Sequence, residues 1–233
     1  MFLILLSGII LGGIFNFLVY LVTIEEFTSE KEVKKMSNLD MIKFSVKKIR
    51  GNLKELVITI GVTSFIFVTL AFKYGIGYEF YKFSFLFSIL IIATIIDYKT
   101  RSVYIIVSIV GISGGIMFST INIVIFDSNV LNEMISMFIP IIILGILKVA
   151  SRKIDGFGGG DIEMFIFIAL YLSVIGTVVT LILSFILAGI ISGVSMILKS
   201  KNKDIAFVPY ITIATYITVI LGEQIFQSYI KFL

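Results

Sequence analysis

Two aspartates stand where a carboxylate can do acid–base chemistry. Asp97 ends a long apolar stretch, and Asp161 follows the glycine-rich run 156–160 and opens another apolar stretch. Ionisable groups at the ends of such stretches are functional hypotheses by default, because they are costly near lipid. Two carboxylates that share a water can hydrolyse a peptide bond, since one takes the proton of the water and the other donates to the scissile carbonyl oxygen. Asp97 and Asp161 are therefore predicted to be a catalytic pair.

Composition limits the other chemistry that the chain can perform. None of its 233 residues is His or Cys. A Ser-His-Asp triad needs an imidazole, a cysteine protease needs a thiol, and most zinc sites need His or Cys ligands. Acid–base work therefore falls to carboxylates, Lys or Tyr, and the sequence predicts no metal site.

Each aspartate also has a purely structural interpretation. Asp161 can be the N-cap of the helix that follows it, where its carboxylate accepts backbone N–H groups. Asp97 lies near a predicted helix C-terminus, where the helix dipole disfavours an anion, and its alternative role is a salt bridge to Lys99 or Arg101. The same dipole argument predicts Asp161 as the base and Asp97 as the acid of the pair.

Glycine dominates the segment before Asp161. Four of the five residues 156–160 are Gly, and such a run lets the backbone approach another group closely. Gly158, Gly159 and Gly160 are therefore predicted to lie along a bound substrate strand. The alternative is an ordinary loop.

The segments that must position these residues are apolar helices. Hydrophobic residues make up 58% of the chain, and the mean hydropathy is +1.11. A helix needs about 20 apolar residues to cross a bilayer. The sequence predicts an all-α, polytopic membrane protein whose transmembrane helices, about eight in number, lie at roughly 2–23, 56–72, 80–97, 103–126, 134–150, 162–176, 178–198 and 205–224. The split within 162–198 is placed near Gly176.

The Lys and Arg residues indicate an orientation in the membrane. With these spans, 16 of them fall in loops on one side, eight of these within 24–55, and 3 fall on the other side. Cytoplasmic loops carry an excess of Lys and Arg. The N-terminus is therefore predicted outside, with both aspartates at the cytoplasmic end of a multi-pass protein of the cytoplasmic membrane. The net charge of +4 then reflects orientation, and no nucleic acid partner is predicted.

One integral membrane domain is predicted over residues 1–233. The segment 24–55 mixes both charge signs with scattered apolar residues, which predicts a short cytoplasmic loop or an amphipathic segment on the membrane surface. The first six residues contain no Lys or Arg. The first span is therefore expected to be retained rather than removed as a signal peptide.

Four sequence blocks resemble the GxGD aspartyl proteases of membranes, and among these the type IV prepilin peptidase family most closely. The first block is similar to the family's Gly-Ser-Phe-Leu-Asn segment with its following Tyr, and the second to its Asp-x-x-Thr-x segment. The third is the glycine-rich run with its Asp, and the fourth is similar to Ile-x-Phe-x-Pro-Tyr. In chain order the blocks are 12–20, 97–101, 156–161 and 205–210.

The resemblance implies an aspartic endopeptidase that removes short basic leader peptides from prepilins or pseudopilins, proteins of type IV pili and of protein secretion. It carries over Asp97 and Asp161 as the catalytic pair, and Gly158 and Gly160 as the motif glycines. No cofactor is implied for proteolysis. Many bacterial members also N-methylate the new amino terminus with S-adenosylmethionine, and no feature of the sequence supports this second activity.

The sequence departs from the family pattern in several places. Leu21 stands where an Arg usually follows the first-span Tyr, Val103 where a Pro is common, and Glu163 where a Lys follows the motif Asp. Many bacterial members carry a Cys-rich cytoplasmic domain, and here only the short, Cys-free segment 24–55 is present. Proteolysis is predicted, and N-methylation stays open.

Other protein classes provide three alternatives. A small membrane transporter would need charged groups at mid-membrane depth, and Asn16 is among the few strongly polar residues inside the spans. A structural membrane subunit needs no glycine-rich loop ending in Asp. A presenilin-like intramembrane aspartyl protease shares Gly-x-Gly-Asp, but Asp97 follows Ile96 instead of that class's Tyr, and 208–210 differs from its Pro-Ala-Leu.

Overall fold

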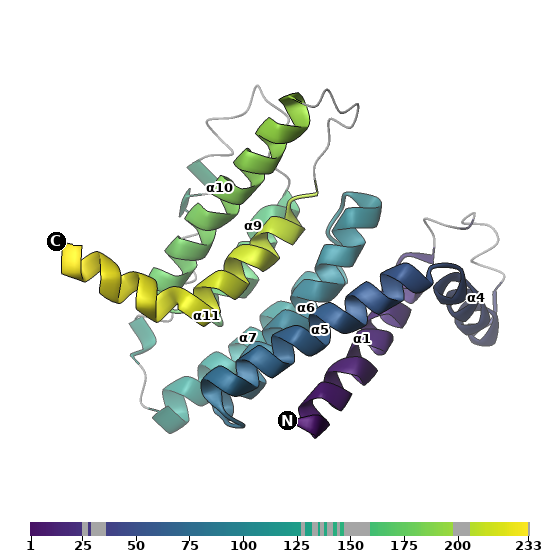
Figure 1. The fold of residues 1–233 in the computed structure, drawn as a ribbon, viewed down its shortest axis with the longest axis horizontal. Coiled ribbons are helices and arrows are strands. Elements are labelled where there is room, and N and C mark those ends of the chain that lie inside the picture. Colours follow the sequence, from purple (N-terminus) through teal and green to yellow (C-terminus); the bar gives the residue numbers. More distant parts are fainter. Residues whose placement is uncertain are drawn as a thin grey trace. The chain divides into compact units, whose positions relative to one another are not determined.

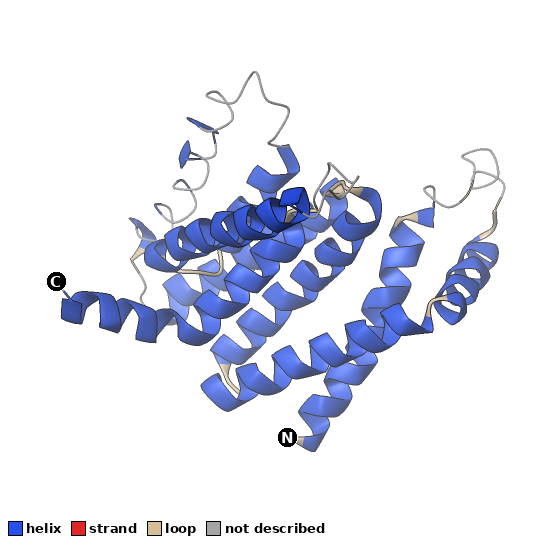
Figure 2. Cartoon of the chain, turned by 45° about the horizontal axis from the view of Figure 1, so that its top comes forward, coloured by secondary structure: helices blue, strands red, loops and turns tan. Residues whose placement is uncertain are grey.

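The computed structural model describes residues 1–24, 28, 36–126, 129–131, 135, 138, 142–143, 145–146, 159–197 and 206–232. Every regular element within these residues is a helix, and none is a strand (Figure 2). This confirms the predicted all-α class. Most of the predicted span 134–150 lies outside the described residues, as does Gly158. The chain divides into two compact units, which are described separately, and a single domain over 1–233 stays a prediction.

The described helices are, in chain order, α1 (Phe2–Val22), α4 (Asn38–Gly51), α5 (Leu53–Tyr74), α6 (Tyr78–Thr100), α7 (Ile105–Phe126), α9 (Gly159–Ala169), α10 (Val174–Ile197) and α11 (Val208–Phe232). Five of them are long and apolar enough to cross a bilayer, namely α1, α5, α6, α7 and, over Val174–Val194, α10. The apolar part of α11 over Val208–Gly222 is shorter. These lengths confirm a polytopic membrane protein, because a crossing needs about 20 apolar residues.

The predicted span 162–176 is wrong in its extent. The helix there, α9, ends at Ala169 after 11 residues, which is too short to cross a bilayer alone. The chain then turns, and α10 begins at Val174. Ser173 acts as the N-cap of α10, because its Oγ accepts the backbone N–H of Gly176 at 3.2 Å. Uninterrupted hydropathy conceals this helix boundary, so the pattern places the split too late, near Gly176.

The first unit, Met1–Thr100, contains α1, α4, α5 and α6. α1 packs along α5, and both contact α6 (Figure 1). Two glycines allow the close approach of α1 and α5. A Cβ on Gly8 would lie 2.6 Å from the Cα of Ser64, and a Cβ on Gly12 would lie 2.7 Å from the Cα of Ile60. Small residues spaced by four let the backbones of membrane helices meet in this way.

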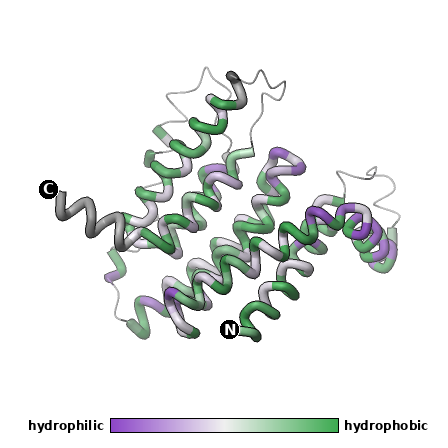
Figure 3. The backbone as a smooth tube through the Cα atoms, viewed as in Figure 1, coloured by the Kyte–Doolittle hydropathy of each residue, from purple (hydrophilic) through white to green (hydrophobic). Residues whose placement is uncertain are grey.

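α4 begins with a capping box. Ser37 Oγ accepts the backbone N–H of Asp40 at 3.3 Å, and the carboxylate of Asp40 accepts the backbone N–H of Ser37 at 3.2 Å. The Ser37 hydroxyl also donates to this carboxylate, and these hydrogen bonds lower the pKa of Asp40. Figure 3 shows α4 mostly in hydrophilic colours, in contrast to the largely hydrophobic α1. Part of the segment 24–55 is therefore a helix, and its place on the membrane surface stays a prediction.

The second unit, Arg101–Leu233, contains α7, α9, α10 and α11 among its described residues. Its core is α9, whose completely buried side chains are Met164, Phe165, Phe167, Ile168 and Ala169. α7 packs on α9 through two glycines spaced by four. A Cβ on Gly111 would lie 2.7 Å from the ring of Phe167, and a Cβ on Gly115 would lie 2.6 Å from the Cβ of Leu170. Close packing among apolar side chains and against the glycines of α7 therefore holds α9 in place.

Aromatic rings and hydroxyls join the remaining helices of this unit. The ring of Phe207, directly before α11, lies 6.5 Å from the ring of Phe165 on α9 and 5.6 Å from that of Phe185 on α10. In the buried contact between α10 and α11, Thr180 Oγ1 donates to Thr218 Oγ1 at 3.0 Å. The chain around Phe207 thus fixes both α9 and α10.

Candidate active site

Asp97 lies in the last turn of α6, within the first unit. It is 6% exposed, and its neighbour Ile96 is completely buried. The hydroxyl of Thr100 donates to the backbone carbonyl of Ile96 at 3.0 Å, which closes this turn from within. Arg101 ends the helix with a φ of 56°, in the left-handed region that residues other than Gly rarely adopt. The turn that carries Asp97 therefore packs into the core through Ile96 and ends abruptly at Arg101.

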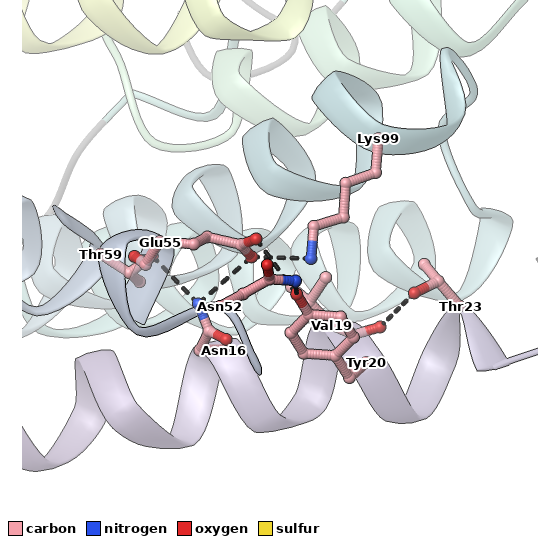
Figure 4. Close-up of polar contacts among 8 residues, drawn as sticks. All are labelled: Asn16, Val19, Tyr20, Thr23, Asn52, Glu55, Thr59 and Lys99. Atoms are coloured by element: carbon pink, nitrogen blue, oxygen red, sulfur yellow. Dashed lines mark hydrogen bonds and ion pairs between the residues drawn. The ribbon is translucent and has the colours of Figure 1, made fainter. Parts of the chain in front are cut away.

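Lys99 extends from the same turn toward the other helices of the first unit (Figure 4). Its ammonium lies 2.7 Å from Glu55 Oε1 on α5 and 3.5 Å from the centre of the Tyr20 ring on α1. The face of an aromatic ring attracts a cation at such a distance. The side chain of Lys99 is 13% exposed and that of Glu55 is 28% exposed. Water therefore screens this ion pair less than it screens a pair on an open surface.

Further polar groups of α1 and α5 hold Glu55. Tyr20 Oη donates to Glu55 Oε2 at 3.1 Å, and Asn16 Nδ2 lies 3.4 Å from Glu55 Oε1 and 3.3 Å from Thr59 Oγ1. Asn52, which precedes α5, donates to Tyr20 Oη at 2.7 Å. Asn16 and Tyr20 are buried. We call this group the polar cluster; its members are Asn16, Tyr20, Asn52, Glu55, Thr59 and Lys99 (Figure 4).

Asp161 lies in the first turn of α9, within the second unit, and is half-buried. Because α9 begins at Gly159, Asp161 lies inside the helix and not at the N-cap position that the sequence also allowed. The positive end of the helix dipole favours a carboxylate there. Gly160 has a packing reason, since a Cβ on it would lie 3.0 Å from the Cβ of Val103. Gly158 lies outside the described residues, and substrate binding by the three glycines stays a prediction.

The predicted pair is divided between the two units. Asp97 belongs to the first and Asp161 to the second; each is described within its own unit, and their pairing stays a prediction. Within the second unit, Val103, which follows Asp97 closely in the sequence, lies against Gly160, the residue before Asp161. Among the described residues, no group of three or more His, Cys, Asp or Glu side chains could hold a metal ion.

Each unit brings two of the four sequence blocks together. In the first unit, the block 12–20 meets the block of Asp97 where the ring of Tyr20 lies under the ammonium of Lys99. In the second unit, Phe207 of the last block packs on α9, the helix that the glycine-rich block opens. Blocks far apart in the sequence thus support the two turns that carry the aspartates.

The central part of the chain matches a known family. Residues 84–193 match the model of the type IV leader peptidase family, and this range contains both Asp97 and Asp161. This match supports assignment of the chain to that family. No curated protein and no solved structure matches the chain.

Assignment to the type IV leader peptidase family indicates a protease, which in this family is of the aspartic type. It also implies peptide substrates, and together with the five long apolar helices it indicates a multi-pass membrane protein. The resemblance seen in the four blocks is therefore confirmed at the level of the family. The blocks 12–20 and 205–210 lie outside the matched residues.

Glu55 is not among the predicted site residues, because it stands directly before an apolar stretch and resembles the charges of the preceding loop. Spacing is the signal that identifies it. Glu55, Thr59 and Thr63 recur every four residues along α5, and Asn16 and Tyr20 do so along α1. Residues with this spacing lie on one face of a helix. Such a polar stripe marks the face by which two apolar helices meet.

Proposed function

We propose that this protein is a membrane aspartyl endopeptidase that removes leader peptides from prepilin-like proteins at the cytoplasmic face of the cell membrane. Asp97 and Asp161 are its catalytic residues. The observation that carries the proposal is the match to the type IV leader peptidase family, because the matched range, 84–193, includes both aspartates. Their settings support it, since each lies in a terminal turn of its helix.

The mechanism is hydrolysis by a water held between the two carboxylates. The ionised carboxylate takes a proton from the water while the water oxygen attacks the scissile carbonyl carbon, and the protonated carboxyl donates to the carbonyl oxygen. The carboxyl that took the proton from the water then gives it to the leaving nitrogen as the C–N bond breaks, and a hydroxyl of the tetrahedral intermediate returns a proton to the other carboxylate. Asp161 is the base, because the N-terminus of α9 favours its negative charge, and Asp97, at the C-terminus of α6, is the acid. Two carboxylates that share a water titrate as one unit, so these roles describe the state before cleavage.

Two further features of the proposal come from the sequence. The cytoplasmic face follows from the excess of Lys and Arg on one side of the predicted spans, and prepilins or pseudopilins as substrates follow from the family. The glycine-rich run is proposed to face the substrate strand. Packing against Val103 already explains Gly160, so this substrate contact rests on Gly158 and Gly159.

The test is leader removal from a prepilin encoded in the same genome, by the purified full chain in lipid nanodiscs. Asp97→Asn and Asp161→Asn keep the size of each side chain and remove its charge. Each should slow cleavage about 100-fold or more, as expected for the loss of an acid–base group. Asp40→Asn is the matched control, because Asp40 is an exposed carboxylate of α4, and it should cleave at the wild-type rate.

Wild-type cleavage by either Asp97→Asn or Asp161→Asn would end the two-carboxylate mechanism. The same assay separates proteolysis from N-methylation. Proteolysis is expected without any added cofactor. When S-adenosylmethionine is supplied, the mass of the new amino terminus reports whether it is methylated, and the proposal covers proteolysis alone.

A further inference from the structure

The contacts of the polar cluster converge on Glu55, which pairs with Lys99 in the turn that carries Asp97. We propose that Lys99, held by Glu55 and Tyr20, is a positioning residue that fixes the last turn of α6 and thereby the direction of the Asp97 side chain. This proposal rests on the proposed catalytic role of Asp97.

Lys99 connects α6 with two other helices at once. Its ammonium contacts a carboxylate of α5 at 2.7 Å and a ring of α1 at 3.5 Å. The last four carbonyls of a helix have no partner within the helix, and helix ends fray. Contacts from neighbouring helices therefore decide whether a terminal turn keeps one conformation. Lys99 supplies two such contacts in the turn of Asp97.

Helix geometry links this anchor to Asp97. Successive residues are about 100° apart around a helix axis, so Asp97 and Lys99 lie on nearly opposite sides of α6. A side chain anchored on one side prevents the turn from rotating and fixes the side chain on the other. Thr100 adds to this effect, because its hydroxyl bonds back to the carbonyl of Ile96 across the same turn.

Glu55 is held so that its charge stays where it meets Lys99. Its oxygens accept from Tyr20 and Asn16, and Asn52 donates in turn to the Tyr20 hydroxyl. Hydrogen bonds to an ionised group are about twice as strong as those between neutral groups. Removal of one partner of a partly buried ion pair leaves the other charge uncompensated. A neutral side chain at Glu55 would therefore release Lys99 from the ion pair.

Stability alone does not require an ion pair at this position. Apolar side chains of similar volume in place of a buried ion pair are often neutral or stabilising. The other end of α6 provides the contrast, because Glu79 and Lys82 form an ion pair at 2.9 Å between two residues of α6 itself. Lys99 instead joins α6 to α5 and α1, which is the arrangement that a positioning role requires.

The experiment measures kcat and KM for leader removal by the purified full chain in nanodiscs. Glu55→Gln and Lys99→Met should each lower kcat about 10- to 100-fold, the effect of a small misplacement of a catalytic group, with KM unchanged. The double variant should be no slower than Lys99→Met, because both changes remove the same contact. Lys99→Arg should keep most of kcat, since a guanidinium can pair with a carboxylate and stack on a ring. Glu79→Gln is the matched control and should keep the wild-type kcat.

Each other outcome overturns the inference in a recognisable way. An unchanged kcat in Glu55→Gln, alongside an inactive Asp97→Asn, removes the positioning role and leaves the proposed function intact. A raised KM with unchanged kcat assigns Lys99 to substrate binding instead. An active Asp97→Asn removes the proposed function and this inference together. Should Lys99→Met fail to fold, Tyr20→Phe, which keeps the ring and removes one donor to Glu55, must still lower kcat.

A different observation concerns α4. Its exposed apolar side chains are Leu39, Ile42 and Val46, and the exposed basic side chains beside them are Lys43, Lys47 and Arg50. We also propose that this side of α4 binds an anionic lipid surface. Asn52 alone separates α4 from α5, a helix of membrane-spanning length, so the exposed side chains lie next to the end of a span. Basic side chains along an apolar stripe match the charge of anionic headgroups.

The absence of Cys from the chain permits single-site labelling of the full protein. A fluorophore at Ile42→Cys should be quenched by acyl-brominated phosphatidylglycerol in nanodiscs, and one at Lys47→Cys, beside the stripe, should be quenched less. Nanodiscs of brominated phosphatidylcholine alone should quench the Ile42→Cys label less strongly. Equal quenching at the two positions, or equal quenching in the two lipids, would overturn the proposal.

Discussion

Asp97 and Asp161 are held in place by two different kinds of contact. The turn of Asp97 is held by polar groups, because Lys99 reaches a carboxylate and a ring on two neighbouring helices. Asp161 belongs to α9, whose later residues are mostly buried among apolar side chains and lie against the glycines of α7. Polar contacts depend on particular atoms in a particular geometry, whereas close packing depends on volume. The turn of Asp97 should therefore be sensitive to substitutions that remove a charge without changing side-chain size. The helix of Asp161 should instead be sensitive to substitutions that add volume without adding polarity.

Added volume beneath α9 should have the largest effect. Gly115→Leu places a side chain where even a Cβ would lie 2.6 Å from Leu170, so α9 must move. We expect a loss of about 3 kcal/mol in the free energy of unfolding, the upper part of the range for overpacking, and little remaining cleavage. Thermal unfolding and leader removal are the measurements. Gly189→Leu is the control, since nothing lies within 4 Å of a Cβ there. Equal losses of stability and cleavage in both variants would show that close packing against α7 is not what holds the helix of Asp161.

Added volume between α1 and α5 should have the next largest effect. Gly12→Leu forces the two helices apart, because a Cβ there would lie 2.7 Å from the Cα of Ile60. We expect a loss of about 2 kcal/mol in the free energy of unfolding and a lower kcat, because Tyr20 moves away from Glu55. Its neighbour Gly13 is the control, since nothing lies within 4 Å of a Cβ on it. A Gly13→Leu variant as slow as Gly12→Leu would show that the helix contact does not act on the turn of Asp97.

The loss of one hydroxyl beside Asp97 should have a smaller effect. Thr100→Val keeps the shape of the side chain and removes its hydrogen bond to the Ile96 carbonyl. We expect a cost of about 1 kcal/mol, the usual net value of one hydrogen bond, and a several-fold lower kcat. In Thr120→Val the same bond, to the Ile116 carbonyl, is lost from α7. If both variants lowered kcat equally, the turn of Asp97 would need no special support.

Protonation of the α4 cap should have the smallest effect. Hydrogen bonds from Ser37 lower the pKa of Asp40, so the charged carboxylate stabilises the folded state above the pKa of the unfolded chain. This contribution is lost as the pH falls from roughly 5 through the lower folded-state pKa. As the pH is lowered over this window, the Tm of the wild type should therefore fall slightly more steeply than the Tm of Asp40→Asn. Identical curves would remove Asp40 from the acid dependence.

The sequence predicted the helices better than it predicted the contacts that hold the two aspartates in place. Long apolar stretches and their ends fix the class and most of the boundaries, because lipid demands about 20 apolar residues for a crossing. The helix boundary at Ser173 escaped prediction, since one capping hydroxyl does not change the hydropathy of its surroundings. The two aspartates proposed as catalytic stood out because a charge at the end of an apolar stretch is rare.

The contacts that hold each aspartate in place could not be predicted as well as the helices themselves. The contact of Lys99 with Glu55 joins residues 44 positions apart, and pairing over such a distance depends on how helices pack. The role of Gly160 depends equally on Val103, which lies far from it in the sequence. Spacing by four in α1 and α5 predicts that two faces meet, but it does not predict which residue of one face meets which residue of the other.

The glycine face of α1 has one more consequence. Gly8 and Gly12 repeat after about one helical turn, and a slide of α1 by about 6 Å, the rise of four residues, would bring Gly8 to the place of Gly12 beside Ile60. Glycines alone therefore permit more than one register between α1 and α5. The same slide would carry Tyr20 a full turn away from Glu55, so the polar cluster selects one register, as a lone polar residue does in a coiled coil. Leucines in place of the polar cluster would keep α1 and α5 together but would leave the register between these two helices undetermined.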